Sequence, residues 1–241
     1  MNVESNTQSQ ARAWPDIFAE ETDRSAIGAP SYTLAADAIR RDIIDGRFAD
    51  GERLMTNDLA DRYKLSLAPI REALLALSAE GIVILQPKRG AVVRTITPAF
   101  IEEIYEIRLG LIPYLEGERA AIASDEDVSR MRQIQADFED AAARGTRDAV
   151  IQRNIEFHGV ALNIRPNREA LQILRRHHTL IRALRARFGY GPSRMDDMID
   201  EHHRIIDAFA RHSREAAQEV SRQHLGNAYR ELIERISGTS R

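Results

Sequence analysis

The sequence predicts a mainly α-helical protein, in which a small helical domain with a two-stranded hairpin precedes an all-α bundle of six or so helices. Helix-forming Ala, Leu, Arg, Glu and Ile dominate the 241 residues and aromatic residues make up only 6%, which disfavours a β-sandwich. Apolar positions recur at helical spacing along most of the chain, and one short segment has the pattern of strands. The 43% hydrophobic content is sufficient for a buried core.

The beginning of the chain divides into a polar arm and a first helix. Residues 1–30 are polar and acidic, contain Pro15 and Pro30, and show no sustained periodicity, which predicts a flexible arm. From Tyr32 onward, apolar residues repeat at helical spacing until Gly46. This pattern predicts a helix that starts the first folded domain.

Two more helices and a hairpin complete a domain predicted at residues 31–97. The helices are expected at 56–63 and 66–80, with Thr56 and Ser66 as N-caps because their side-chain oxygens can accept from free backbone N–H groups. Two short apolar runs then flank a basic turn within residues 82–94, which predicts a two-stranded wing. Three helices followed by a hairpin are the order of a winged helix-turn-helix.

The overall composition excludes several classes of protein. The chain has no cysteine, hence no disulfide framework and no thiolate metal site. Its apolar runs are too short for a membrane span or a signal segment, so we expect a cytoplasmic protein without a membrane partner. The net charge of −3 is unusual for a nucleic-acid binder, but residues 81–97 contain Lys88, Arg89 and Arg94 and no acidic residue.

Beyond Thr97-Pro98 the sequence predicts only helices, in a second domain at residues 98–236 that ends in a short tail at 237–241. Gly145, Pro166 and a Gly- and Pro-containing segment separate consecutive helices. The expected helices are 98–123, 125–143, 147–163, 168–188, 195–212 and 213–236.

Several residues of the first domain suit contact with double-stranded DNA. The helix at 66–80 would enter the major groove, where Ser66 and the free N–H groups of the first turn can hold a phosphate. Arg71, one turn further, can reach a phosphate or a guanine edge. Lys88, Arg89 and Gly90 at the hairpin tip suit a wing that follows the DNA backbone or enters the minor groove. Spacing alone leaves open a packing module without DNA contact.

Several short sequence motifs within residues 32–97 form a specific signature. They are Ile43 to Gly46, Gly51-Glu52-Arg53-Leu54, Ser66-Leu67-Ala68-Pro69-Ile70-Arg71-Glu72-Ala73-Leu74 with Leu77, Glu80-Gly81, and Pro87-Lys88-Arg89-Gly90-Ala91-Val92-Val93. This signature resembles the winged helix of the GntR family of bacterial regulators. The resemblance implies a transcriptional regulator that binds operator DNA, and it argues against the packing module.

The chain departs from the family at the start of the groove-reading helix. The family usually has Arg-Thr where this chain has Leu67-Ala68, and some members have an Arg in place of Asn57. Apolar side chains cannot donate hydrogen bonds to guanine, but they can pack on a thymine methyl group. We therefore predict an operator that differs from the usual family operator at those bases.

Histidines are the informative residues of the second domain. Asn154 and His158 are four residues apart and share one helix face, and His202 and His224 fall on two later helices. Three imidazoles and one oxygen ligand from three helices can hold a divalent metal such as Zn²⁺, Ni²⁺ or Mn²⁺. Each histidine is alternatively an ordinary core or surface residue. Of the remaining ones, His203 is expected to point elsewhere on its helix, and His177, His178 and His212 are interpreted as surface residues.

The same region resembles the FCD sensor domain of the FadR-type branch of the GntR family. The matching residues include Tyr105-Glu106-Ile107-Arg108, Phe157-His158, Glu201-His202, Ile205-Ile206-Asp207-Ala208 and His224-Leu225. In metal-binding members the ligands are one Asp and three His, which correspond here to Asn154, His158, His202 and His224. Asn154 is a departure that removes one negative charge, so metal affinity should fall or metal preference shift.

The resemblance also implies a carboxylate effector. Arg108 matches a position of the first sensor helix from which a guanidinium can clamp a carboxylate by a bidentate pair. An ordinary surface salt bridge with Glu106 or with a neighbouring helix is the alternative for this side chain.

Together these features predict a metabolite-responsive homodimeric regulator, a repressor that is released from DNA by a small carboxylate, with a divalent metal and no organic cofactor. A metal-dependent hydrolytic enzyme fused to a DNA-binding head is one alternative. It is disfavoured because no motif places a carboxylate as general base. A DNA-binding scaffold without a ligand is the other.

Overall fold

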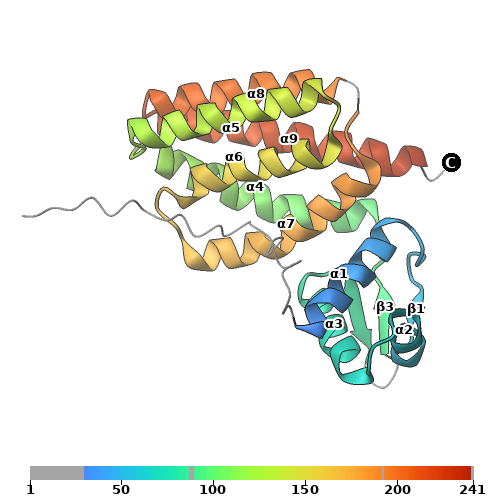
Figure 1. Cartoon of the computed structure of the whole chain (residues 1–241). Helices are drawn as coiled ribbons and strands as arrows, with labels where there is room; N and C mark the ends of the chain where they lie inside the picture. Colours follow the sequence, from blue (N-terminus) through green and yellow to red (C-terminus); the bar gives the residue numbers. More distant parts are fainter. Residues whose placement is uncertain (1–29, 87–89, 192, 240–241) are drawn as a thin grey trace, which may run out of the picture.

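The computed structural model describes residues 30–86, 90–191 and 193–239, which form two domains (Figure 1). Within these residues a small domain holds three helices and a three-stranded sheet, and six long helices form a larger domain beside it. The predicted arm, apart from Pro30, and the last two residues lie outside the described residues.

The small domain has the predicted order of elements. Its parts are α1 (Ser31–Ile44), β1 (Arg53–Leu54), α2 (Thr56–Tyr63), α3 (Leu67–Ala79), β2 (Val83–Gln86) and β3 (Gly90–Val93). Because α3 packs against both α1 and α2, its apolar face is buried. The core includes Ile39, Leu54, Ile70 and Leu77, each at most 1% exposed. This packing leaves the opposite face of α3 for contact with a partner.

The sheet has one strand more than the sequence pattern indicates. Its order is β1-β3-β2, all antiparallel, and Leu54 of β1 stands opposite Ala91 of β3. A strand of two residues is too short to show the alternation of exposed and buried positions by which strands are recognised. The extra strand anchors the wing to the segment before α2.

The large domain consists of helices at nearly the predicted positions. They are α4 (Pro98–Ala120), α5 (Asp125–Ala143), α6 (Arg147–Asn163), α7 (Arg168–Phe188), α8 (Arg194–Ala210) and α9 (Arg214–Thr239). Side-chain caps explain several starts: Thr97 accepts from the backbone of Phe100, and Asn167 from that of Ala170. Ser124 and Asp127 form a reciprocal capping box. No helix among the described residues is long and apolar enough to cross a membrane.

The helices α4 and α9 approach closely at Gly117. A Cβ added there would contact the Gln218 side chain and lie 3.0 Å from the backbone oxygen of Arg214. We expect Gly117→Ala to destabilise the protein by about 1–3 kcal/mol through overpacking, although Ala favours helix by about 1 kcal/mol. Thermal unfolding followed by circular dichroism measures the change. Gly110→Ala is the control, because an added Cβ there meets nothing within 4 Å. Equal melting temperatures for the two variants would contradict the prediction.

The two domains meet along α7, which lies on the side of the bundle that faces α1 (Figure 1). Arg187 of α7 is 3.4 Å from Asp50, which also accepts a hydrogen bond from the backbone of Ile96. About three helical turns earlier, Arg176 lies against Gly81, where an added Cβ would be 3.1 Å from its Nε. The position of α7 is therefore coupled to the small domain at two separate points.

Candidate functional site

Three of the four predicted metal ligands come together inside the large domain. His158 lies on α6, His202 on α8 and His224 on α9, and one ring nitrogen from each lies within 4.8 Å of the others. The Nε2 atoms of His158 and His224 are 3.1 Å apart. His202 and His224 are buried, and the ring of His202 stacks on Phe157 with centroids 4.1 Å apart.

Each of these histidines is oriented by a hydrogen bond from its Nδ1. His158 donates to Glu116 at 3.0 Å. His202 donates to Gln135 at 2.8 Å, and His224 to Glu201 at 2.7 Å. The three acceptors belong to three different helices and are Glu116, Gln135 and Glu201. A neutral imidazole carries one ring proton, so a proton donated from Nδ1 leaves Nε2 free to bind a metal. Metal-bound histidines in proteins are commonly held in this way by a hydrogen-bond acceptor at the other ring nitrogen.

The donor set fits a divalent metal. Nε2 of His202 is buried and has no hydrogen-bond partner among the described residues. Burial lowers the pKa of His202 well below its usual value, and burial also lowers that of His224 despite its bond to Glu201. Both rings are therefore neutral, the form that coordinates. With metal–nitrogen bonds of about 2.0–2.1 Å, neighbouring ligand nitrogens are about 3 Å apart, close to the spacing of His158 and His224.

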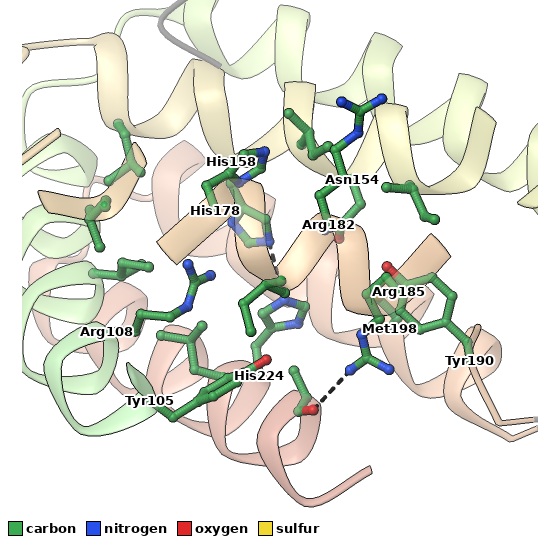
Figure 2. Close-up of a pocket in the computed structure, with 18 of the residues that line it drawn as sticks. Tyr105, Arg108, Asn154, His158, His178, Arg182, Arg185, Tyr190, Met198 and His224 are labelled. Carbon is green, nitrogen blue, oxygen red and sulfur yellow. Dashed lines mark hydrogen bonds between the residues drawn. The ribbon is translucent and has the colours of Figure 1, made fainter. Parts of the chain in front are cut away.

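The fourth predicted ligand, Asn154, lies one helical turn before His158. Its Oδ1 is buried and has no hydrogen-bond partner among the described residues. The side chain lines the same cavity as His158 and His224 (Figure 2). An unpaired buried oxygen is costly unless another group uses it, so Asn154 is a fitting neutral ligand.

The cavity beside the histidines has a volume of about 80 Å³, well above the roughly 10–15 Å³ that one water molecule requires, so it can hold a small ligand. Most of its wall is apolar, with side chains such as Ile112, Ile155, Leu174, Met198 and Leu225. Its polar groups are mainly cationic or neutral bases, namely Arg108, Arg182, Arg185, Arg194 and the histidines. An anion with a small apolar body matches this lining.

Arg108 points into this cavity (Figure 2). Its Nε is buried without a hydrogen-bond partner among the described residues, and the buried Glu116 is the acidic group whose charge reaches it. The guanidinium lies over the ring of Tyr105, 5.6 Å from the centroid. The alternative of an ion pair with Glu106 is therefore not what the structure contains, and the charge is directed toward the cavity instead.

The prediction that His178 is a surface residue is wrong. This residue of α7 is half-buried and lines the cavity, where burial and the neighbouring charges of Arg108 and Arg182 lower its pKa to about 3. A neutral His178 adds a polar group next to the guanidinium groups. His203 is exposed and lies 2.8 Å from Glu139, outside the site as expected.

The predicted DNA-contacting residues of the small domain lie on its exposed face. Leu67, Ala68 and Arg71 lie in the first turns of α3, Ser66 directly precedes them, and all four are exposed. Asn57, also exposed, lies at the start of α2. Ser66 stands at the N-cap but bonds to no backbone N–H. Its hydroxyl and the first N–H groups of α3 are thus available to a phosphate.

The wing is described up to its tip. Gly90 has a φ of +83° and is exposed, and an added Cβ would lie 3.4 Å from the backbone oxygen of Leu54. Glycine is therefore the residue that this turn requires. Lys88 and Arg89 lie outside the described residues.

Sequence patterns did not reveal the residues that orient the histidines. Glu116 is completely buried and lies in a predicted helix with no special spacing to His158. Glu201 adjoins His202 in the chain but serves His224, which lies on another helix. Arg194, 2.7 Å from Glu201, holds that carboxylate in turn. In the sequence, these residues could have been recognised as charged positions on otherwise apolar helix faces.

Comparison with known families agrees with both domains. Residues 31–93 match the model described as "Bacterial regulatory proteins, gntR family", and residues 103–227 match the FCD domain. The second match alone spans more than half of the chain. A Bacillus subtilis protein named as the uncharacterized HTH-type transcriptional regulator YdhC is 27% identical over 82% of this chain and 89% of its own length.

Other relatives carry repressor names. The gluconate operon transcriptional repressor of Bacillus licheniformis is 29% identical over 70% of this chain and 72% of its own length. A solved structure of a GntR regulator from Rhodococcus sp. RHA1 covers 84% of this chain and 97% of its own, with a TM-score of 0.65 at 24% identity, and supports the fold. The chain belongs to the GntR family of DNA-binding transcriptional regulators, with an FCD domain as its C-terminal part, and not to a family of enzymes.

Proposed function

We propose that this regulator is a repressor whose operator affinity is controlled by a small carboxylate bound at a divalent metal in the FCD domain. The supporting observation is the group of three imidazoles on α6, α8 and α9, each with Nδ1 occupied and Nε2 directed to a common point. Asn154, His158, His202 and His224 would hold Zn²⁺, Ni²⁺ or Mn²⁺. Such a metal supplies a Lewis-acidic position for an anion.

The effector is proposed to be a carboxylate because of Arg108. Its guanidinium is directed into the cavity and its Nε has no hydrogen-bond partner among the described residues, so an anionic ligand would pair with it. The apolar side chains of the wall would contact the body of the ligand.

Helix α7 is the proposed route from the effector to DNA. Its residues Leu174, His178 and Arg182 line the cavity, whereas Arg176 and Arg187 contact the small domain. An effector that repositions α7 would therefore reorient the DNA-reading head, with a coupling of about 1–3 kcal/mol. Repression is proposed because relatives of comparable length, including the gluconate repressors, carry that name.

Operator binding is proposed to involve a homodimer, so that two copies of α3 read two half-sites. Exposed apolar side chains on the large domain support this, with Ile107 at 45% and Tyr114 at 56% exposure on the same helix, α4. In each copy, Ser66 and Arg71 would contact phosphate or a guanine edge, and Leu67 with Ala68 would pack on thymine methyl groups. Asn57, Lys88, Arg89 and Gly90 would add contacts to the backbone or the minor groove.

The metal content of the purified protein tests the proposal. We expect elemental analysis to find about one divalent metal per chain in the native protein and little in His158→Ala, because the variant removes one of the three imidazoles. His203→Ala, which removes an exposed histidine on α8, is the control and should keep its metal. Equal metal in the native protein and in His158→Ala would rule the site out.

Functional alternatives differ in their response to ligands. A ligand-free scaffold would show no change in stability with either EDTA or small organic acids. An enzyme would consume a bound acid, whereas the proposed regulator would bind it unchanged.

A further inference from the structure

We infer that Arg94 is a positioning residue for operator recognition: it fixes the orientation of the small domain against the large domain, so that the two small domains of a dimer reach two half-sites together. The inference rests on the proposed function, because it requires the homodimer. Arg94 itself contacts no DNA in this arrangement and acts through the angle at which α3 is presented.

The covalent connection between the two domains is short and is fixed where α4 begins. Since β3 ends at Val93 and α4 begins at Pro98, the connection consists of residues 94–97. Thr97 caps α4 by accepting a hydrogen bond from the backbone N–H of Phe100 at 3.2 Å. The ring of Pro98 fixes its own φ in the first turn of the helix. A change in the orientation of the small domain must therefore arise within residues 94–97.

The side chain of Arg94 connects the two sides of this linker. Its Nε donates a hydrogen bond of 2.5 Å to the backbone oxygen of Gly81, which directly follows the last turn of α3. Its guanidinium also lies over the ring of Phe100 in the first turn of α4, 4.6 Å from the centroid, and Phe100 packs against the core of the large domain. A cation at this distance from an aromatic face is attracted to it. Arg94 thus joins the end of the groove-reading helix to the large domain.

Gly81 is also the point at which α7 contacts the small domain. Its φ is +82°, and an added Cβ would lie 3.1 Å from Nε of Arg176 on α7. Burial and the neighbouring positive charge of Arg176 lower the pKa of Arg94, in agreement with two guanidinium groups that converge on this glycine. The end of α3, the linker and α7 therefore meet at one residue, and Arg94 is the side chain that connects them.

The position of Arg94 separates it from the surface that would read DNA. Ser66 and Arg71 lie at the start of α3, whereas Gly81 lies beyond its end, about 15–20 Å away along the helix axis. Arg94 is half-buried, and its Nε is already bound to the backbone of Gly81. A role in orienting α3 fits this position better than a contact with a phosphate close to Arg71.

A fixed orientation matters only when two half-sites are bound together. Once one small domain of a dimer is on its half-site, the other is held at a high effective concentration near the second half-site, provided that the geometry permits both contacts. A small domain that rotates freely about its linker loses part of this advantage. Binding to a single half-site uses one small domain and does not depend on the relative orientation of the two.

The experiment compares binding of the full-length protein to two DNA duplexes by fluorescence anisotropy. One duplex carries an operator selected from random DNA, and in the other duplex one half-site is scrambled. We expect Arg94→Met, which keeps an unbranched side chain without donor or charge, to bind the two-site duplex about tenfold more weakly and the one-site duplex within about twofold of the native protein. Arg94→Lys keeps a cation and a donor, so it should retain most of the affinity. Arg41→Met removes an exposed charge from α1 and is the matched control.

A second variant tests the contact with α4. Phe100→Leu removes the aromatic ring but keeps an apolar side chain in the core, and it should weaken binding to the two-site duplex by about threefold. Because both substitutions break the same connection, the double variant should bind no more weakly than Arg94→Met alone. Additive losses would show that Arg94 and Phe100 act separately and would contradict the inferred connection.

The outcomes separate this inference from the proposed function. Equal affinity of the native protein for the two duplexes would show that two half-sites are not bound together, so the proposed homodimer on DNA would fail and the inference with it. A native preference for the two-site duplex that persists in Arg94→Met would overturn the inference alone. Equal weakening of both duplexes in Arg94→Met would assign Arg94 to the fold or the DNA contacts of one small domain and would also overturn it. Thermal unfolding followed by circular dichroism verifies that each variant is folded.

Discussion

Removal of the bound metal with EDTA is expected to lower the melting temperature of the large domain by roughly 5–10 °C. A ligand that binds only the folded state at about one hundred times its Kd contributes about 2.7 kcal/mol. For domains of this size one kcal/mol corresponds to about 2–4 °C. The effect is large because the site joins α6, α8 and α9, which are distant in sequence, through His158, His202 and His224. Differential scanning calorimetry of metal-loaded protein, with and without EDTA, measures the shift.

The control for this result is the same measurement on two histidine variants. His158→Ala should show little change on addition of EDTA, since it has lost one ligand. His203→Ala should respond like the native protein, because His203 is exposed and lies outside the cluster. An EDTA shift of equal size in His158→Ala would place the stabilising metal elsewhere.

Replacement of Arg71 by alanine is expected to weaken operator binding by about 1–3 kcal/mol, which is roughly 5- to 150-fold. Arg71 is the basic residue of the first turns of α3, and its side chain is exposed. The loss is measured by fluorescence anisotropy with operator DNA at fixed salt, since phosphate contacts make affinity depend on salt.

Two further variants identify the role of Arg71. Arg71→Lys keeps the charge but loses the planar fork, so it should retain most of the affinity if the contact is to phosphate and lose specificity if the contact is to guanine. Arg41→Ala, on the exposed side of α1, controls for loss of charge in the small domain. A native affinity in Arg71→Ala would contradict the assignment of α3 as the groove-reading helix.

Most of the fold was predictable because its signals are local. Helix ends follow from capping residues such as Ser124 and Asn167 and from glycines that stop a helix, and these act within a few residues. The first domain was predictable in the same way, from three helices and a hairpin in a fixed order. The strand β1 was not, since its two residues become a strand only by pairing with β3.

The candidate site was predictable only in part. The spacing of Asn154 and His158 on one helix is a local property, and resemblance to the FCD domain indicated His202 and His224. The cavity position of His178 was not predictable, because it depends on how α7 rotates against the other helices.

By itself, therefore, the sequence determined the helices, the two domains and which side chains are capable of binding a metal or DNA. Only the tertiary structure decided that Glu116, Gln135 and Glu201 each hold a histidine from another helix, and that Arg108 is directed into the cavity. The reason is physical: caps and periodicity act along the chain, whereas burial, charge pairing and ligand geometry arise between segments that only packing brings together.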